Sequence, residues 1–175
     1  MTWLKLLIIT VLFFALAVLQ TGFFPHVAVL GFSPNLVFAL FFTVIFFEDP
    51  QEYAGGFFCV LAAGFLLDAF SPYYFGTAML SLFIIYILFK AAVHFLSQMR
   101  GKYLLAYFAA LFLIFFSFYS VLMQGLVGLP HISIGFPPDF FAALAYNLAF
   151  AAAMFFGYAF FARPQANTRQ LRLFK

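Results

Sequence analysis

Residues 64–76 read GFLLDAFSPYYFG and place a single carboxylate, that of Asp68, between two apolar runs. Apolar runs that are separated by short clusters of Gly, Pro and polar residues are typical of membrane helices. A charge at the centre of a bilayer costs about 2.5 to 3.5 kcal/mol on insertion scales. Asp68 is therefore either functional or placed away from the membrane centre.

The composition around this stretch indicates a membrane protein. Of 175 residues, 67% are hydrophobic and 7% are charged, whereas roughly a quarter of the residues of a soluble domain are charged. A water-soluble fold of this size has too little interior to bury so much apolar surface. The apolar runs are continuous and do not alternate with period two, so we predict an all-α polytopic membrane protein. The abundant Phe residues are interpreted as lipid-facing and helix-packing side chains that fill the bilayer, and not as the sign of a ligand.

Six membrane helices are predicted, at 4–22, 34–47, 53–70, 75–97, 103–127 and 139–162. The second is short: at about 1.5 Å per residue it reaches only about 21 Å, and the hydrocarbon core is about 30 Å thick. The first run is too long for a signal-peptide core and lacks a small-residue cleavage site, so it is expected to stay as a span. We predict one transmembrane domain, 1–162, and a basic tail, 163–175.

The cations predict the orientation. Lys5 precedes the first helix, Arg100 and Lys102 lie between the fourth and fifth, and the last four follow the sixth: Arg163, Arg169, Arg172 and Lys175. The predicted connections on the other side contain no Lys or Arg, so the positive-inside rule places both termini in the cytoplasm. The tail is expected to touch anionic membrane lipid and not nucleic acid.

With this topology, Asp68 lies near the outer end of the third helix. There it is expected to be partly hydrated or to accept hydrogen bonds from Ser71, Tyr73 or backbone N–H groups. Lys90 lies about two turns from the cytoplasmic end of the fourth helix. The two charges are therefore expected in opposite leaflets and not as an ion pair.

The charges on the cytoplasmic side are interpreted as solvated. The long stem of Lys90 is predicted to carry its ammonium group toward the lipid headgroups, with a buried ion site as the alternative. Glu48, Asp49 and Glu52 surround the predicted turn after the second helix. We interpret them as turn and capping residues with solvated charge, with a divalent-metal site as the alternative.

Uncharged polar residues gather in the predicted outer half of the bundle. This group contains Gln20, Asn35, Thr77, Gln124 and Asn147. Such side chains satisfy unpaired helix ends and link neighbouring helices, at about 1 kcal/mol each or less. The alternative is a polar recess that receives a ligand or a helix of another protein.

A stripe of residues at intervals of four runs along the third helix: Gly56, Val60, Gly64 and Asp68. Glycines at such spacing allow the backbone of a neighbouring helix to approach closely. The neighbour is either another helix of this chain or a helix of a partner.

Several short motifs between about residues 15 and 85 resemble one family. They are Leu19-Gln20, Pro25, Ser33-Pro34-Asn35-Leu36, Asp49-Pro50, Tyr53-Ala54-Gly55, Gly64-Phe65-Leu66-Leu67-Asp68 and Phe75-Gly76-Thr77-Ala78. In this order they are similar to the rod shape-determining protein MreD family. Beyond residue 100 the similarity is limited to helix number and the basic tail.

The resemblance implies a subunit of the bacterial inner membrane that belongs to the cell-elongation machinery, which makes lateral-wall peptidoglycan. The implied partners are MreC, which has a single span, together with MreB, RodA and a class B penicillin-binding transpeptidase. The implied fold is that of the substrate-binding subunits of energy-coupling-factor transporters. The resemblance assigns no catalytic residue and no cofactor.

Three functions follow as hypotheses. The first is a non-enzymatic assembly subunit whose outer polar residues and Gly stripe dock a partner helix, with Gly76 and Thr77 at the start of the fourth helix. The second is a small-molecule-binding transporter subunit with Asp68, Asn35, Gln124 and Asn147 around a pocket. An enzyme is the least favoured hypothesis, because no cluster of catalytic residue types is evident.

Overall fold

The computed structural model of the protein describes residues 3–27, 33–49, 51–72, 74–96, 104–127 and 140–166. Within these ranges the chain forms α-helices, one short 3-10 helix and no strand. The elements are α1 (Trp3–Gly22), η1 (Phe24–Val27), α2 (Leu36–Phe47), α3 (Ala54–Ala69), α4 (Thr77–Leu96), α5 (Leu104–Val127) and α6 (Phe140–Ala166). The all-helical prediction with six helices is confirmed. α6 continues to Ala166, so residues 163–166 of the predicted tail are helical.

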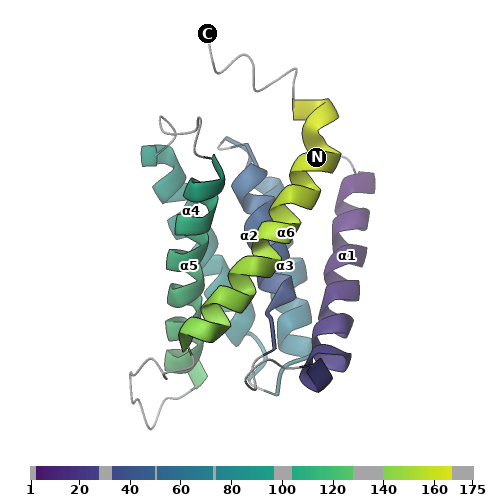
Figure 1. Cartoon of the computed structure of the whole chain (residues 1–175), viewed down its shortest axis with the longest axis vertical. Helices are drawn as coiled ribbons and strands as arrows, with labels where there is room; N and C mark the ends of the chain where they lie inside the picture. Colours follow the sequence, from purple (N-terminus) through teal and green to yellow (C-terminus); the bar gives the residue numbers. More distant parts are fainter. Residues whose placement is uncertain are drawn as a thin grey trace.

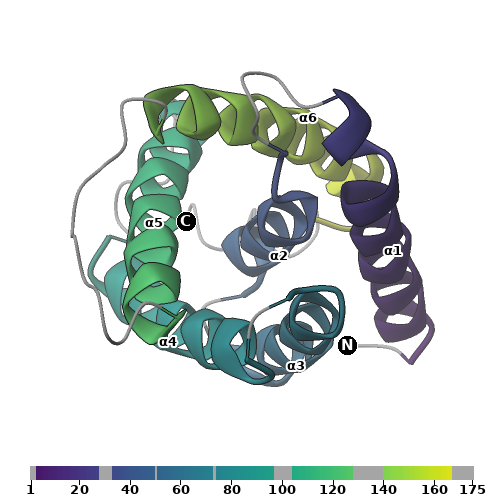
Figure 2. The same ribbon diagram turned by 90° about the horizontal axis from the view of Figure 1, so that it is seen from below.

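The helices lie side by side and alternate in direction, with the start of α1 and the end of α6 at the same end of the bundle (Figure 1). Viewed along the bundle, α1, α3, α4, α5 and α6 surround α2 (Figure 2). We call the end where α2, α4 and α6 begin the α2 N-terminal end. The opposite end, where α2 stops, is the α2 C-terminal end.

The central position of α2 follows from its sequence, LVFALFFTVIFF. A helix that is apolar on every side has no face that prefers water and is buried in a core or a membrane. Every residue from Leu36 to Phe46 is buried. The hydroxyl of Thr43, its one polar side chain, donates to the Ala39 carbonyl at 2.8 Å. α2 therefore forms the axis of the bundle.

A stripe of aromatic rings on α2 holds the core together. Phe38, Phe42 and Phe46 recur every four residues and so share one face of the helix. The ring of Phe112 on α5 lies 5.8 Å from Phe38 and 5.4 Å from Phe42, and that of Phe108 lies 5.0 Å from Phe46. These pairs are close to edge-to-face, a favoured aromatic geometry. These Phe residues are buried in the core, so of the two predicted uses of Phe they serve helix packing and not contact with lipid.

Three helical stretches are long and apolar enough to cross a membrane: Trp3–His26, Leu104–Val127 and Phe140–Phe160. The others are shorter apolar helices. Large apolar side chains remain exposed on the outer helices, including Leu7 (61%), Ile114 (62%) and Phe141 (70%). These features are consistent with a membrane protein. The predicted shortness of the second helix is confirmed, since α2 has 12 residues, and the prediction of six spans stays a prediction.

Candidate functional site

Three amide side chains from three helices meet at the start of α2. The first N–H groups of any helix lack partners within the helix. The Phe38 N–H donates to Asn35 Oδ1 at 2.9 Å, and the Val37 N–H donates to Gln20 Oε1 of α1 at 3.3 Å. The Asn35 N–H donates to Asn147 Oδ1 of α6 at 2.6 Å. The structure thus brings together Gln20, Asn35 and Asn147, and each amide helps to cap the central helix.

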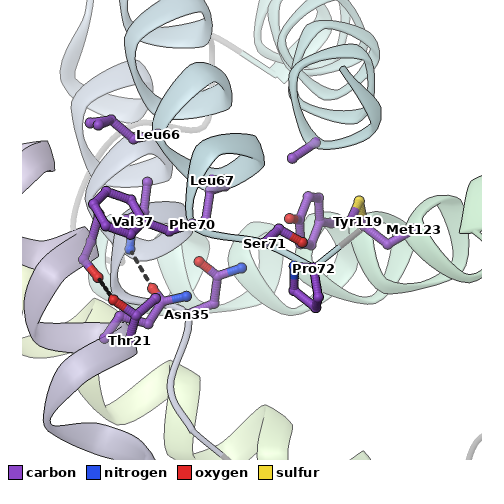
Figure 3. A pocket seen from close by; sticks show the side chains of 13 residues that line it. Thr21, Asn35, Val37, Leu66, Leu67, Phe70, Ser71, Pro72, Tyr119 and Met123 are labelled. Carbon is purple, nitrogen blue, oxygen red and sulfur yellow. Dashed lines mark hydrogen bonds between the residues drawn. The ribbon is translucent and has the colours of Figure 1, made fainter. Parts of the chain in front are cut away.

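A recess adjoins these caps at the α2 N-terminal end, with a cavity volume of about 220 Å³. Figure 3 shows its lining, which comes from α1, α2, α3, α4, α5 and the turn after α3. The lining mixes amide, hydroxyl, aromatic and thioether groups, among them Gln20, Thr21, Asn35, Phe70, Tyr119 and Met123. This polar recess between apolar helices is the candidate functional site.

Asp68 caps a second helix. Its side chain is buried, at 4% exposure, and its carboxylate accepts from the Ala78 N–H at 2.9 Å and the Met79 N–H at 3.1 Å. The Thr77 hydroxyl lies 3.5 Å from the same carboxylate. A negative charge at a helix N-terminus is also favoured by the helix dipole. The prediction that backbone N–H groups bind Asp68 is confirmed.

Gly76 makes the tight approach to α4 possible. Its φ angle is +98°, a conformation that residues with a side chain rarely adopt. The hydroxyl of the next residue, Thr77, donates to the Tyr74 carbonyl at 2.8 Å. Gly76 and Thr77 therefore shape the turn that carries the N–H groups of α4 to Asp68.

The Gly stripe of α3 faces α4. A Cβ atom placed on Gly64 would lie 2.6 Å from the Cα atom of Met79, and one on Gly56 would lie 2.7 Å from Cζ of Tyr86. Real side chains do not sit so close, so both glycines allow the two helices to touch. The sequence left open whether the stripe meets a helix of this chain or of a partner. In the structure it meets α4 of the same chain.

Gln124 is not brought to the recess. It is exposed in the last turn of α5 and does not belong to the lining of the recess. Asp139, the other acid of the predicted outer half of the bundle, and His131, in the predicted outer connection before the sixth helix, lie outside the described residues. Among the residues that the structure does describe, no three His, Cys, Asp or Glu side chains are grouped as metal ligands.

An ion pair lies at the α2 C-terminal end. A buried ion site was the alternative interpretation of Lys90, but sequence reasoning missed its partner. Lys90 Nζ lies 2.8 Å from Glu48 Oε2, and the two side chains are only 8% and 7% exposed. The same ammonium donates to the carbonyls of Asp49 at 3.0 Å and Glu52 at 2.7 Å. The prediction that Lys90 reaches the headgroups is wrong, because its ammonium instead binds the turn after α2. Solvated charge fits the exposed Asp49 and Glu52 but is wrong for Glu48.

Further bonds fix this ion pair between α2, α3 and α4. Glu48 Oε1 accepts from the Gly56 N–H at 2.5 Å, and the Tyr86 hydroxyl donates to the Tyr53 carbonyl at 2.9 Å. The signal in the sequence was the common depth of Lys90 and Glu48, which both lie near the predicted cytoplasmic end of their helices. Pairing was considered only with Asp68, whose depth is different.

Comparison of the chain with protein-family models, with curated proteins and with solved structures finds no match. The resemblance to the MreD family therefore stays a prediction that rests on the motifs between about residues 15 and 85.

Proposed function

We propose that the chain is a non-enzymatic, MreD-like subunit of the bacterial inner membrane that docks the membrane helix of a partner such as MreC. In this role it takes part in cell-shape maintenance within the elongation machinery, alongside MreB, RodA and a class B penicillin-binding transpeptidase. Both chain ends lie in the cytoplasm, and the recess at the α2 N-terminal end lies on the outer side. The observation that carries the proposal is this recess.

The size of the recess supports a protein side chain as its occupant. Its volume is about 220 Å³, below the range of about 300 to 1,000 Å³ that is usual for small-molecule pockets. Phe70 lines it with 41% of its side chain exposed. Membrane helices associate through close packing and a few interhelical hydrogen bonds, and an apolar rim around two amides offers both.

The walls of the recess are held in place before any partner arrives. Gln20 of α1 and Asn147 of α6 both bond the start of α2, and Asp68 bonds the start of α4. A site whose walls are already ordered loses less conformational entropy on binding. The capping bonds therefore support docking as well as folding.

The test fills the recess without breaking a bond between helices. Thr21 lines the recess, and its hydroxyl donates only within α1, to the Ala17 carbonyl at 2.9 Å and to the Val18 carbonyl at 3.4 Å. We expect Thr21→Phe to weaken co-purification with an MreC-like partner about tenfold, a loss of about 1.4 kcal/mol. The matched control is Val18→Phe, which adds a ring to α1 at a site with 45% exposure outside the recess lining.

Unchanged co-purification of the Thr21→Phe variant would contradict the proposal, and so would an equal loss for both variants. Neighbouring genes give an independent check, since the proposal expects MreB-like and MreC-like genes beside this one.

A small-molecule-binding subunit of a transporter is the second candidate. The observation that favours it is the convergence of Gln20 and Asn35 with the ring of Tyr119 at one recess, since ligand pockets combine apolar walls with a few polar groups. Native mass spectrometry of the purified protein distinguishes the two. A defined small molecule retained by the wild type and lost from Thr21→Phe would favour the transporter subunit.

A further inference from the structure

We propose that the group docked in the recess is a hydrogen-bond acceptor, the carbonyl or carboxylate oxygen of an Asn, Gln, Asp or Glu side chain on the partner's membrane helix. This inference rests on the proposed function and specifies the chemistry of the same recess.

The two amides of the recess have already used their oxygen atoms. A primary amide carries one acceptor oxygen and an NH₂ group with two donor protons. Gln20 Oε1 accepts from the Val37 N–H, and Asn35 Oδ1 accepts from the Phe38 N–H. These bonds fix which way each amide points. No atom of the described residues accepts from Gln20 Nε2 or Asn35 Nδ2, so both NH₂ groups have donor protons to offer.

The free donor group of Asn35 points into the recess, and Gln20 belongs to the lining of the same recess. In Figure 3 the amide nitrogen of Asn35 is directed toward Ser71 and Pro72 on the far wall. The hydroxyl proton of Thr21 is committed to its own helix. The partial positive charge at the start of α2 adds to the preference for an oxygen. The available hydrogen-bond protons therefore favour an acceptor in this space.

Among the described residues, no carboxylate takes this place. Asp68 is buried at 4% exposure and is bonded to the start of α4. It does not belong to the lining of the recess, although Leu67 beside it does. Since the described residues supply no acceptor for these NH₂ groups, we infer that it comes from another molecule.

The surroundings favour a membrane helix as the source of that acceptor. Apolar side chains make up much of the lining, among them Ala17, Leu66 and Phe70, and Phe70 is 41% exposed. An apolar rim suits an occupant that is apolar except for one polar group. If the docked group were a donor, it would find no acceptor, and the NH₂ groups of the two amides would also stay unpaired. Unpaired polar groups away from water are costly.

The test measures association with peptides of defined chemistry. The full chain is placed in phosphatidylcholine vesicles with a fluorescent polyleucine transmembrane peptide that carries one guest residue in its outer third. Four guests are compared: Gln, Glu, Lys and Leu. We expect the Gln and Glu peptides to bind about tenfold more tightly than the Leu peptide, as one interhelical hydrogen bond would give. The Lys peptide, which brings only donors, is expected to bind no better than the Leu peptide.

A double substitution in the protein turns the hydrogen-bond donors of the recess into acceptors and keeps the oxygens that cap α2. Gln20→Glu with Asn35→Asp retains the oxygens that bind the Val37 and Phe38 N–H groups and replaces both free NH₂ groups by oxygen. We expect this variant to lose its preference for the Gln and Glu peptides and to gain one for the Lys peptide. The matched control is Gln124→Glu, the same exchange outside the recess lining, which should keep the wild-type order.

Equal binding of the four peptides to the wild type would overturn the inference. That result is also expected if a lipid ester oxygen, and not a helix, fills the recess. The inference then fails alone, provided that Thr21→Phe still loses an MreC-like partner. If Thr21→Phe loses nothing, the proposed function fails as well. An unchanged thermal unfolding midpoint for each variant shows that its helix caps remain. If the double variant does not fold, the comparison of the four peptides on the wild-type protein tests the inference by itself.

Discussion

Asp68 is a structural carboxylate whose two oxygens both serve the start of α4. Removing one partner of a buried hydrogen bond costs about 1 to 3 kcal/mol. We therefore expect Asp68→Leu to lower the thermal unfolding midpoint in detergent more than Asp68→Asn, which keeps one acceptor oxygen. Equal midpoints for wild type and both variants would contradict this role. Weaker partner binding by Asp68→Leu would therefore have two causes, the loss of the cap on α4 and the loss of docking.

The ion pair of Glu48 and Lys90 is expected to behave as one unit. Removing one member of a buried pair leaves an unpaired charge and costs about 3 to 5 kcal/mol, whereas neutral, well-packed replacement of both costs much less. Glu48→Gln and Lys90→Met should each lower the free energy of unfolding in mixed micelles. The double variant should lose less than the sum of the two single losses. Additive losses would show that the side chains act independently.

The sequence predicted part of the recess at the level of side chains. Asn35 directly precedes an apolar run, a position typical of a helix cap, and the polar residues were expected in one half of the bundle. Asn35 and Asn147 were placed near one pocket as a hypothesis, but the direct bond between them was not predictable, because 112 positions separate them. Their contact depends on which helix occupies the centre, and nothing local in the sequence states that.

The packing of α3 on α4 depends on Gly64. A methyl group there would lie 2.6 Å from the Cα atom of Met79, so the two backbones must move apart. We expect Gly64→Ala to lower the thermal midpoint in detergent. The matched control is Gly157→Ala in α6, where nothing lies within 4 Å of the added Cβ. Its midpoint should stay the same or rise, since Gly costs about 0.5 to 1 kcal/mol in a helix. Equal shifts would show that this contact is not tight.

All six helices were predictable because Gly, Pro and charged residues separate the apolar runs. The place of α2 was not. Its uniform apolar surface fits contact with lipid as well as burial, and its shortness suggested little tilt, a thinned bilayer or incomplete crossing. The structure offers a different reason. Its 12 residues, about 18 Å at 1.5 Å per residue, are enclosed by the neighbouring helices, so α2 need not match the thickness of a membrane by itself.

The assembled bundle makes a prediction about orientation. α1 begins and α6 ends at the same end, and the cations predict that this end is cytoplasmic. A green fluorescent protein fused after Lys175 should therefore fluoresce, and alkaline phosphatase at the same position should be inactive. Phosphatase inserted after Pro130 should be active. An active phosphatase after Lys175 would reverse the orientation and place the recess on the cytoplasmic side.

The enclosure of α2 has a consequence for how the protein is made. α2 leaves the ribosome before α5 and α6 are made. We therefore expect its aromatic rings to contact lipid until those two helices have been added. The bond from the Asn35 N–H to Asn147 forms only then. A product that stops short of α6 leaves its innermost helix uncovered and partly uncapped. We expect membrane proteases that recognise incomplete bundles to degrade such a product, so that the chain becomes stable in the cell only once α6 has been made.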